Sequence, residues 1–267
     1  MGGGKEIVRN MSQLPFLGIV STAHINQPFL QHLAQTCHFD FVSALSDQDG
    51  IFLVVSDLQI SIHTHHQHQK LEYCSGFTEA SLAYRSHKTS IHQEPLAEAI
   101  GLKHGTPLTV VDTTAGWGRD AFILASLGAK MIVLEQSPVL WFMLMYNIHI
   151  YKQQSDLDDI LMECFWNKSQ DWLSSLSHDD KPEVVYLDPM FPEKKKTSLA
   201  KKEMQILQLL LGKGDEDESA QLLQASLKVA AKRVVVKRPS RASFLGDVTP
   251  SFSKAGKSAR FDVYVMV

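Results

Sequence analysis

Cysteine is scarce in this chain, and a long apolar run is missing from it. The three cysteines, Cys37, Cys74 and Cys164, are widely spaced and form no Cys-x-x-Cys pair. A disulfide framework and a thiolate metal site are therefore not indicated. No window approaches the roughly 18 to 20 apolar residues that a membrane-spanning helix needs, and no apolar segment follows the first residues. We therefore expect a cytoplasmic protein that contacts no membrane.

A histidine cluster is the other place where a metal could bind. It lacks partnering cysteines, and its spacing matches no known set of zinc ligands. We therefore expect a solvated loop at this point and no bound metal. The cluster comprises His63, His65, His66 and His68.

The composition is that of an ordinary globular protein. Hydrophobic residues make up 44% of the 267 positions and charged residues 21%, which argues against extended disorder and against a fibrous chain. This length accommodates a catalytic domain of about 170 to 200 residues with a smaller appendage. The formal net charge of -3 by itself argues weakly against a nucleic-acid partner, because polyanion binding draws on a positive surface.

The apolar pattern divides the chain into two parts. Residues 1–71 mix strand-like and helix-like runs, and this pattern predicts a small N-terminal α+β domain. Residues 72–267 alternate strands with helices, which predicts an α/β fold with a doubly wound, Rossmann-like sheet. In the first part we expect strands at 16–20, 51–55 and 59–63 and a helix at 28–36. In the second we expect strands at 108–112, 131–135, 184–187, 233–237 and 261–267, helices at 95–101, 119–127, 137–151, 199–211 and 219–231, and an acidic loop at 212–218.

A glycine-containing turn follows the first strand of the second part. The segment from Val110 to Asp120 reads VVDTTAGWGRD, which places Gly116 and Gly118 between a buried strand and a helix. Glycine there lets a ligand come close to the backbone. Glu135 ends the next strand, where a carboxylate can accept two hydrogen bonds from a ribose diol. Together these features indicate a nucleoside-binding edge.

The turn alone leaves more than one interpretation open. A dinucleotide-binding oxidoreductase normally carries Gly-x-Gly-x-x-Gly, and the third position here is Ala121, which some dinucleotide folds tolerate. Asp112, which closes the first strand, would repel a pyrophosphate but suits a cationic sulfonium cofactor with an amino-acid tail. The remaining alternative is a purely structural turn with a solvated Glu135.

The most informative stretch reads VVYLDPMFP from Val184 to Pro192. Methylation of an amino group conjugated with a ring requires acceptors for the amino hydrogens, so that the nitrogen lone pair is freed. The Asp188 carboxylate and the carbonyl of Pro189 can supply them, and Phe191 can stack on the base, which contributes about 1 to 3 kcal/mol. Positioning of the reactants lowers the barrier most. An isolated Asp-Pro is more often only a strand-ending turn, but this one follows a cofactor loop of the matching type.

Two clusters of basic residues accompany this stretch. One follows the reaction motif directly, and the other lies in and after the strand expected at 233–237. A run of charge is usually a solvated helix face, but at these positions we expect contacts with RNA phosphates beside a flipped base. The residues are Lys194, Lys195, Lys196, Lys201, Lys202, Lys237 and Arg238.

From about Leu71 onward the chain resembles the bacterial ribosomal small-subunit RNA methyltransferase J family. The resemblance rests on ordered blocks at 112–122, 184–192, 201–204, 232–239 and 260–262. It implies a class I methyltransferase fold, S-adenosylmethionine (SAM) as cofactor, and methylation of a guanine N2 amino group in 16S rRNA. The partner would be free 16S rRNA or the small ribosomal subunit.

The resemblance also implies which residues contact the cofactor, in addition to Asp112, Gly116 and Gly118. They are Arg119, Asp120, Glu135, Gln136, Lys168, Ser169 and Asp188. Adenine N6 or a protein amide remains an alternative target, because the geometry of the amino group is similar. A nucleotide-binding oxidoreductase and a catalytically silent RNA-binding module are the alternatives from other classes.

Overall fold

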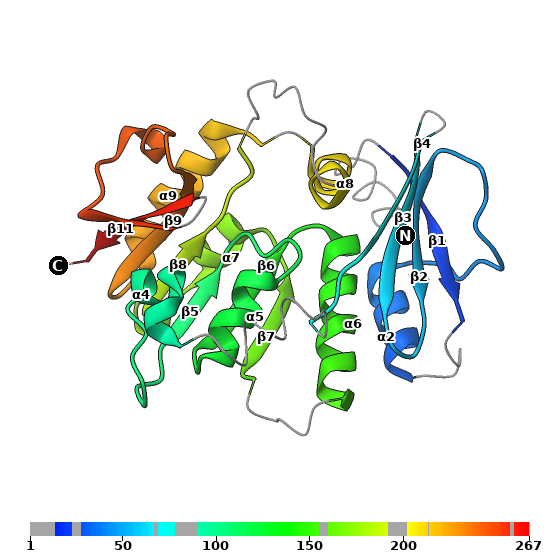
Figure 1. Cartoon of the computed structure of the whole chain (residues 1–267), viewed down its shortest axis with the longest axis horizontal. Coiled ribbons are helices and arrows are strands. Elements are labelled where there is room, and N and C mark those ends of the chain that lie inside the picture. The colour runs from blue at the N-terminus through cyan, green and yellow to red at the C-terminus, as the bar shows by residue number, and fades with distance from the viewer. Residues whose placement is uncertain are drawn as a thin grey trace. The chain divides into compact units, whose positions relative to one another are not determined.

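The computed structural model forms two compact units, each assembled from three segments of the chain (Figure 1). It describes residues 14–22, 28–66, 69–77, 90–154, 160–191, 202–212, 214–256 and 259–266. Unit 1 comprises Met1–Glu79, Ser137–Asp156 and Glu193–Lys213, and unit 2 comprises Ala80–Gln136, Leu157–Pro192 and Gly214–Val267. The boundary that we expected after residue 71 falls within a strand of unit 1, Gln69–Cys74. As a division into independently folding domains, it stays a prediction.

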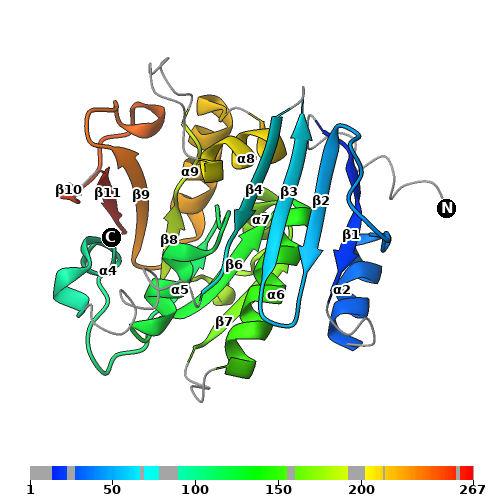
Figure 2. The same ribbon diagram turned by 45° about the vertical axis from the view of Figure 1, so that its right-hand side comes forward.

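Unit 1 contains a four-stranded sheet in the order β1-β2-β3-β4 (Figure 2). β1 (Phe16–Ser21) runs parallel to β2 (Gly50–Val55), whereas β3 (Ile60–His66) and β4 (Gln69–Cys74) continue the sheet antiparallel. β2 reads GIFLVV and is almost entirely buried, as expected of β-branched and aromatic residues in an inner strand.

In the described part of unit 1, three helices accompany the sheet. α2 (Pro28–Cys37) packs against α6 (Pro138–Gln154), α6 also contacts β3, and α8 (Lys202–Leu211) packs against β4. The Cys37 thiol is buried in this interior, and burial raises its pKa to about 12, so it remains a protonated packing group. Across the described ranges, no helix combines the length and the apolar character that a bilayer crossing requires.

Unit 2 is built on a seven-stranded sheet in the order β10-β11-β9-β8-β5-β6-β7. β5 to β9 are parallel, β11 runs antiparallel to β9, and β10 runs antiparallel to β11. The strands are β5 (Thr109–Asp112), β6 (Lys130–Glu135), β7 (Met162–Trp166), β8 (Val184–Leu187), β9 (Arg233–Pro239), β10 (Phe252–Ala255) and β11 (Ala259–Val265).

Helices cover both faces of this sheet. Val185 and Leu187 of β8 pack in one apolar cluster with Leu173 of α7 (Ser169–Ser175) and Leu222 of α9 (Glu216–Val229). Side chains alternate along a strand, so Tyr186 points to the other face, where its hydroxyl reaches α5 (Arg119–Ser126). The doubly wound α/β architecture is therefore confirmed. The helices of unit 2 are α4 (Pro95–Ile100), α5 (Arg119–Ser126), α7 (Ser169–Ser175) and α9 (Glu216–Val229), with short 3-10 turns at Ile91–Gln93, His178–Asp180 and Leu245–Asp247.

The acidic stretch before α9 differs from our expectation of a loop at 212–218. Glu216, Asp217 and Glu218 form the first turn of α9, and Asp215 caps it by accepting hydrogen bonds from the backbone N–H groups of Asp217 and Glu218. Carboxylates stabilise a helix N-terminus because it carries partial positive charge. The expectation was therefore wrong for residues 216–218.

The histidine cluster also differs from our expectation of a solvated loop. His63, His65 and His66 lie in β3, which is paired on both edges, whereas His68 lies outside the described residues. The hydroxyl of Ser61 lies 3.0 Å from Nε2 of His63. Among the residues that the structure describes, no group of three or more His, Cys, Asp or Glu side chains is arranged to hold a metal ion.

Candidate active site

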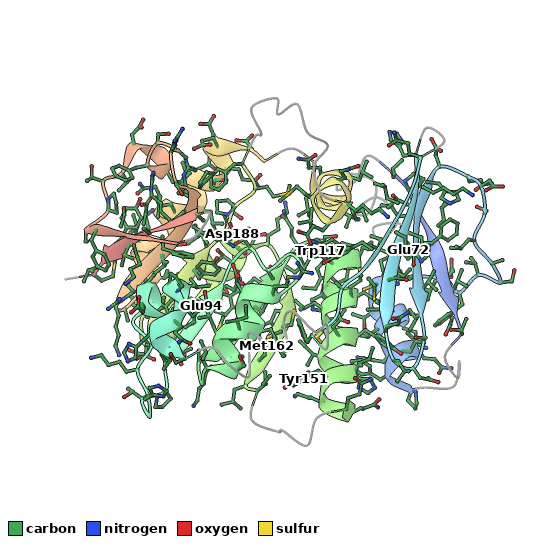
Figure 3. All side chains as sticks on the ribbon, in the orientation of Figure 1. Glu72, Glu94, Trp117, Tyr151, Met162 and Asp188 are labelled. Carbon is green, nitrogen blue, oxygen red and sulfur yellow. The ribbon has the colours of Figure 1, made fainter. Side chains whose placement is uncertain are left out.

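Two loops meet where the order of the strands in unit 2 reverses. From β5 the chain proceeds to β6 and β7 on one side, and from β8 to β9 on the other, and ligands of open α/β sheets bind at the carboxyl ends of the strands at such a point. We call residues 113–118, after β5, the cofactor loop and residues 188–191, after β8, the reaction loop. Trp117 and Asp188 lie toward one end of the sheet, and Met162, which begins β7, lies toward the other (Figure 3).

Hydrogen bonds join the cofactor loop to β8 and to the reaction loop. The N–H and hydroxyl of Thr113 both donate to the carbonyl oxygen of Tyr186, over 3.0 and 2.9 Å. The N–H of Asp188 donates to Oγ1 of Thr114 over 2.6 Å. The two loops are therefore held in fixed register, as expected of a site that must align two reactants.

Two glycines allow the path of the cofactor loop. Gly116 has φ 53° and Gly118 has φ 72°, a left-handed conformation that glycine adopts without strain. Within the described residues, no heavy atom outside the adjoining chain lies within 4 Å of where a Cβ of Gly116 would stand, so this side of the turn offers room. The N–H of Gly116 donates to Oε2 of Glu135 over 2.9 Å, and this hydrogen bond holds the carboxylate at the turn. Glu135 is only 5% exposed.

The chain after β7 comes to the same edge. The Ser169 hydroxyl donates to the carbonyl oxygen of Thr113 over 2.6 Å, and the indole N–H of Trp166 donates to the carbonyl oxygen of Gln136 over 3.0 Å. Lys168 is the residue that precedes α7 and is exposed. The structure thus brings the expected cofactor residues Gln136, Lys168 and Ser169 to the edge where Glu135 lies. Their contacts with the cofactor stay predictions.

Carboxylates converge behind the two loops, around a single lysine. Nζ of Lys237 lies 2.7 Å from Oδ2 of Asp120 and 2.8 Å from Oδ2 of Asp188. The Tyr186 hydroxyl donates to the same oxygen of Asp120 over 2.7 Å. Asp112, 2% exposed, accepts a hydrogen bond from the N–H of Thr114. We expected Lys237 to bind RNA, but in the structure its ammonium contacts carboxylates of the candidate site.

The environment shifts the ionisation of this cluster. Burial raises the pKa of Asp112 to about 8; the carboxylates of Asp120 and Asp188 add to the rise, whereas the N–H of Thr114 and the ammonium of Lys237 oppose it. Burial and Asp120 also raise the pKa of Asp188 above its ordinary value, against the effect of Lys237. Burial lowers the pKa of Lys237, but the two carboxylates outweigh it and raise the pKa overall. Three carboxyl groups thus lie around one ammonium, and a further cation such as a sulfonium would favour their ionised forms.

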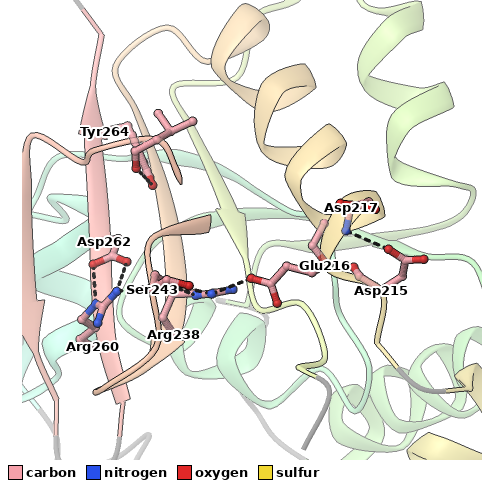
Figure 4. A network of polar contacts seen from close by, with 10 residues as sticks. Asp215, Glu216, Asp217, Arg238, Ser243, Arg260, Asp262 and Tyr264 are labelled. Carbon is pink, nitrogen blue, oxygen red and sulfur yellow. Dashed lines mark hydrogen bonds and ion pairs between the residues drawn. The ribbon is translucent and has the colours of Figure 1, made fainter. Parts of the chain in front are cut away.

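Phe191 rests on a buried arginine. Cζ of Arg238 lies 4.2 Å from the centre of the Phe191 ring, a cation–π contact. Arg238 is only 2% exposed; its guanidinium donates to Oε1 of Glu216 over 2.7 Å and to the carbonyl oxygen of Ser243 (Figure 4). This side chain is engaged inside the protein, and the expected contact between Arg238 and RNA stays a prediction.

The other residues expected to bind RNA are only partly described. Lys202 is exposed and begins α8 in unit 1. The others lie outside the residues that the structure describes, namely Lys194, Lys195, Lys196 and Lys201. Their role stays a prediction.

Three residues that we did not single out shape the site. Thr114 joins the two loops, and Tyr186 joins β8 to Asp120. Gly214 lies so close to the reaction loop that a Cβ in its place would overlap the carbonyl oxygen of Met190. Thr114 and Tyr186 stand within the two informative motifs, but their partners come from distant positions in the chain, and no local pattern indicates them.

Comparison with known proteins identifies the family. The family model described as "Putative SAM-dependent methyltransferase" matches residues 34–266. The curated protein Ribosomal RNA small subunit methyltransferase J of Colwellia psychrerythraea is 37% identical over 93% of this chain and 92% of its own length. The chain belongs to the ribosomal RNA small subunit methyltransferase J family.

Further relatives agree with this assignment. The family member from Tolumonas auensis is 45% identical over 71% of this chain and 76% of its own length. A crystal structure of a SAM-dependent methyltransferase from Neisseria gonorrhoeae is 28% identical, with a TM-score of 0.72 over 93% of this chain and 96% of that chain. The class I methyltransferase fold and SAM as the cofactor are therefore confirmed, and the oxidoreductase alternative loses its basis.

The geometry of the site fits this cofactor. The open side of Gly116 leaves room for a ligand near the backbone, the Glu135 carboxylate is held at the turn, and three carboxyl groups lie around the Lys237 ammonium. Gly116, Glu135 and Asp188 are the residues that we expect to hold it.

Substitution of Glu135 tests this placement. Glu135→Ala removes the acceptor for the ribose and for the N–H of Gly116, and a hydrogen bond to a charged group contributes about 1.5–3 kcal/mol. We therefore expect the Kd for SAM, measured by titration calorimetry, to rise about tenfold to a hundredfold. Glu135→Gln retains an acceptor oxygen and should give an intermediate Kd. Unchanged SAM affinity in Glu135→Ala would remove Glu135 from the site.

Proposed function

We propose that this enzyme transfers the methyl group of SAM to the exocyclic N2 amino group of one guanosine in 16S rRNA. The names of its relatives support the RNA target. The observation that carries the chemistry is the reaction loop. Asp188, whose side chain is 34% exposed, follows β8, and its backbone N–H donates to Thr114 of the cofactor loop. This arrangement suits a flat amine that must be held next to a methyl donor.

The roles of the reaction loop follow from the chemistry of a conjugated amine. SAM, when bound, supplies an electrophilic methyl group, which the nitrogen attacks in line as the carbon–sulfur bond breaks. The Asp188 carboxylate and the carbonyl oxygen of Pro189 accept the amino hydrogens and localise the lone pair on nitrogen. Asp188 then accepts the proton that the methylated nitrogen loses and passes it to solvent. Phe191, backed by Arg238, stacks on the base and fixes its plane.

The same proposal assigns the RNA contacts and the place of the reaction. We assign phosphate binding to the cluster that follows the reaction loop, which comprises Lys194, Lys195, Lys196, Lys201 and Lys202. The substrate would be free 16S rRNA or the small ribosomal subunit, both of which are cytoplasmic.

Mass mapping of 16S rRNA tests the proposal. RNA from cells that lack the protein should miss one N2-methylguanosine, and the purified enzyme with SAM should restore it. A missing N6-methyladenosine would move the target to adenine. If every rRNA modification persists, the RNA target is wrong, and a protein amide becomes the target to test.

A further inference from the structure

Lys237 connects the cofactor half and the reaction half of the site. It stands on β9, and its ammonium reaches Asp120 in the first turn of α5 and Asp188 in the reaction loop, over 2.7 and 2.8 Å. The two carboxylates therefore share one cation, and each contacts it through its Oδ2 atom. The Lys237 side chain is 28% exposed, and its ammonium is paired with these two carboxylates.

We propose that Lys237 is a positioning residue for methyl transfer, which keeps Asp188 ionised and holds its Oδ2, so that Oδ1 accepts a hydrogen of the target amine. The inference rests on the proposed function of the reaction loop. It assigns to Lys237 a role that differs from phosphate binding. It also explains why a basic residue stands on the face of β9 that α5 covers.

The charges around Asp188 show what removal of Lys237 would do. Asp120 on α5 and Asp112 at the end of β5 are the carboxylates near it, and Tyr186 on β8 adds a hydroxyl that is bonded to Asp120. Without the ammonium, burial and the like charge of Asp120 would lose the protein cation that opposes them, so the pKa of Asp188 would rise. A protonated acid presents a donor where the amine needs an acceptor, so methyl transfer would stall until a higher pH ionises Asp188.

The pH profile of Lys237→Met is the decisive measurement. In single-turnover methylation of 16S rRNA by the full-length enzyme, we expect a rate below that of the wild type at pH 7, by about tenfold for each unit by which the pKa of Asp188 exceeds the assay pH. The rate should rise toward the wild-type value as the pH increases and Asp188 ionises. The KM for RNA and its dependence on salt should stay unchanged.

Two further variants serve as controls. Lys237→Arg retains the cation and should restore the wild-type pH profile. Lys237→Met combined with Asp120→Asn removes the opposing carboxylate as well, so the pH profile should move back toward that of the wild type. Thermal unfolding and SAM affinity, measured on each variant, separate these effects from loss of the fold.

The possible outcomes distinguish the competing roles. A raised KM for RNA with a shallower salt dependence would show that Lys237 binds phosphate, and an equal loss of rate at every pH would show a merely structural role; either result overturns the inference. NMR titration of the Asp188 carboxyl group, assigned with Asp188→Asn, needs no methyl acceptor. A higher Asp188 pKa in Lys237→Met would support the inference even if the wild-type enzyme left rRNA unmodified, and an unchanged one would refute it.

Discussion

Replacement of Asp188 by alanine should lower the rate constant of methyl transfer about a hundredfold to a thousandfold, the range seen when one preorganised polar group of an active site is removed. The carboxylate is the acceptor that localises the nitrogen lone pair, and its backbone N–H is already bonded to Thr114 in the cofactor loop. That hydrogen bond does not depend on the side chain, so the loop should keep its position. Single-turnover kinetics with saturating SAM measure the effect.

Two variants control this experiment. Asp188→Asn retains one acceptor oxygen but loses the ion pair with Lys237, so its rate should lie between those of the wild type and the alanine variant. Asp217→Asn removes an exposed carboxylate in the first turn of α9 and should leave the rate unchanged. If Asp188→Ala retains the wild-type rate, the reaction loop does not perform the chemistry.

Replacement of Arg260 by methionine should lower the free energy of unfolding by about 3–5 kcal/mol, because it leaves a buried carboxylate without its cation. Asp262 is 0% exposed. Its Oδ1 accepts a hydrogen bond from Nε of Arg260 over 2.9 Å, and its Oδ2 accepts one from the guanidinium of Arg260 over 3.1 Å (Figure 4). Oδ1 also accepts one from the Ser253 hydroxyl over 2.6 Å. Denaturant unfolding measures the loss.

Matched variants establish that the loss comes from the unpaired charge. Arg241→Met removes an arginine that is exposed and should change the free energy of unfolding by less than about 0.5 kcal/mol. Arg260→Met with Asp262→Asn removes both charges and should recover part of the stability. A loss below about 1 kcal/mol in Arg260→Met would show that water or another group solvates Asp262.

The sequence alone predicts the parallel sheet and the two loops because their signals are local. Buried strands of unit 2 are continuous apolar runs, and Gly116 and Gly118 stand where the backbone needs a left-handed conformation. Asp188 directly follows β8, so its position at the carboxyl edge follows from the strand itself. The strand β4 was missed because it has exposed polar positions and no fully buried residue.

The partners of Lys237 and Arg238 could not be predicted in this way. Adjacent residues of a strand point to opposite faces, so these two basic side chains meet different helices. Lys237 meets Asp120 of α5, and Arg238 meets Glu216 of α9. Each pair joins positions far apart in the chain, and only the packing of helices on both faces of the sheet reveals them. The local cluster of basic residues predicts contacts with RNA, and it gives no sign of these partners inside the protein.

The close approach of Gly214 to Met190 has a consequence for how such an enzyme can change. The chain leaves unit 2 after Pro192 and returns to it at Gly214. Gly214 lies directly beside Met190 of the reaction loop. An excursion whose ends adjoin can be lengthened or shortened at small entropic cost, without altering the spacing of the strands that flank it. A change of length within residues 193–213 should therefore leave the seven-stranded sheet of unit 2, and with it the two loops at its edge, in place.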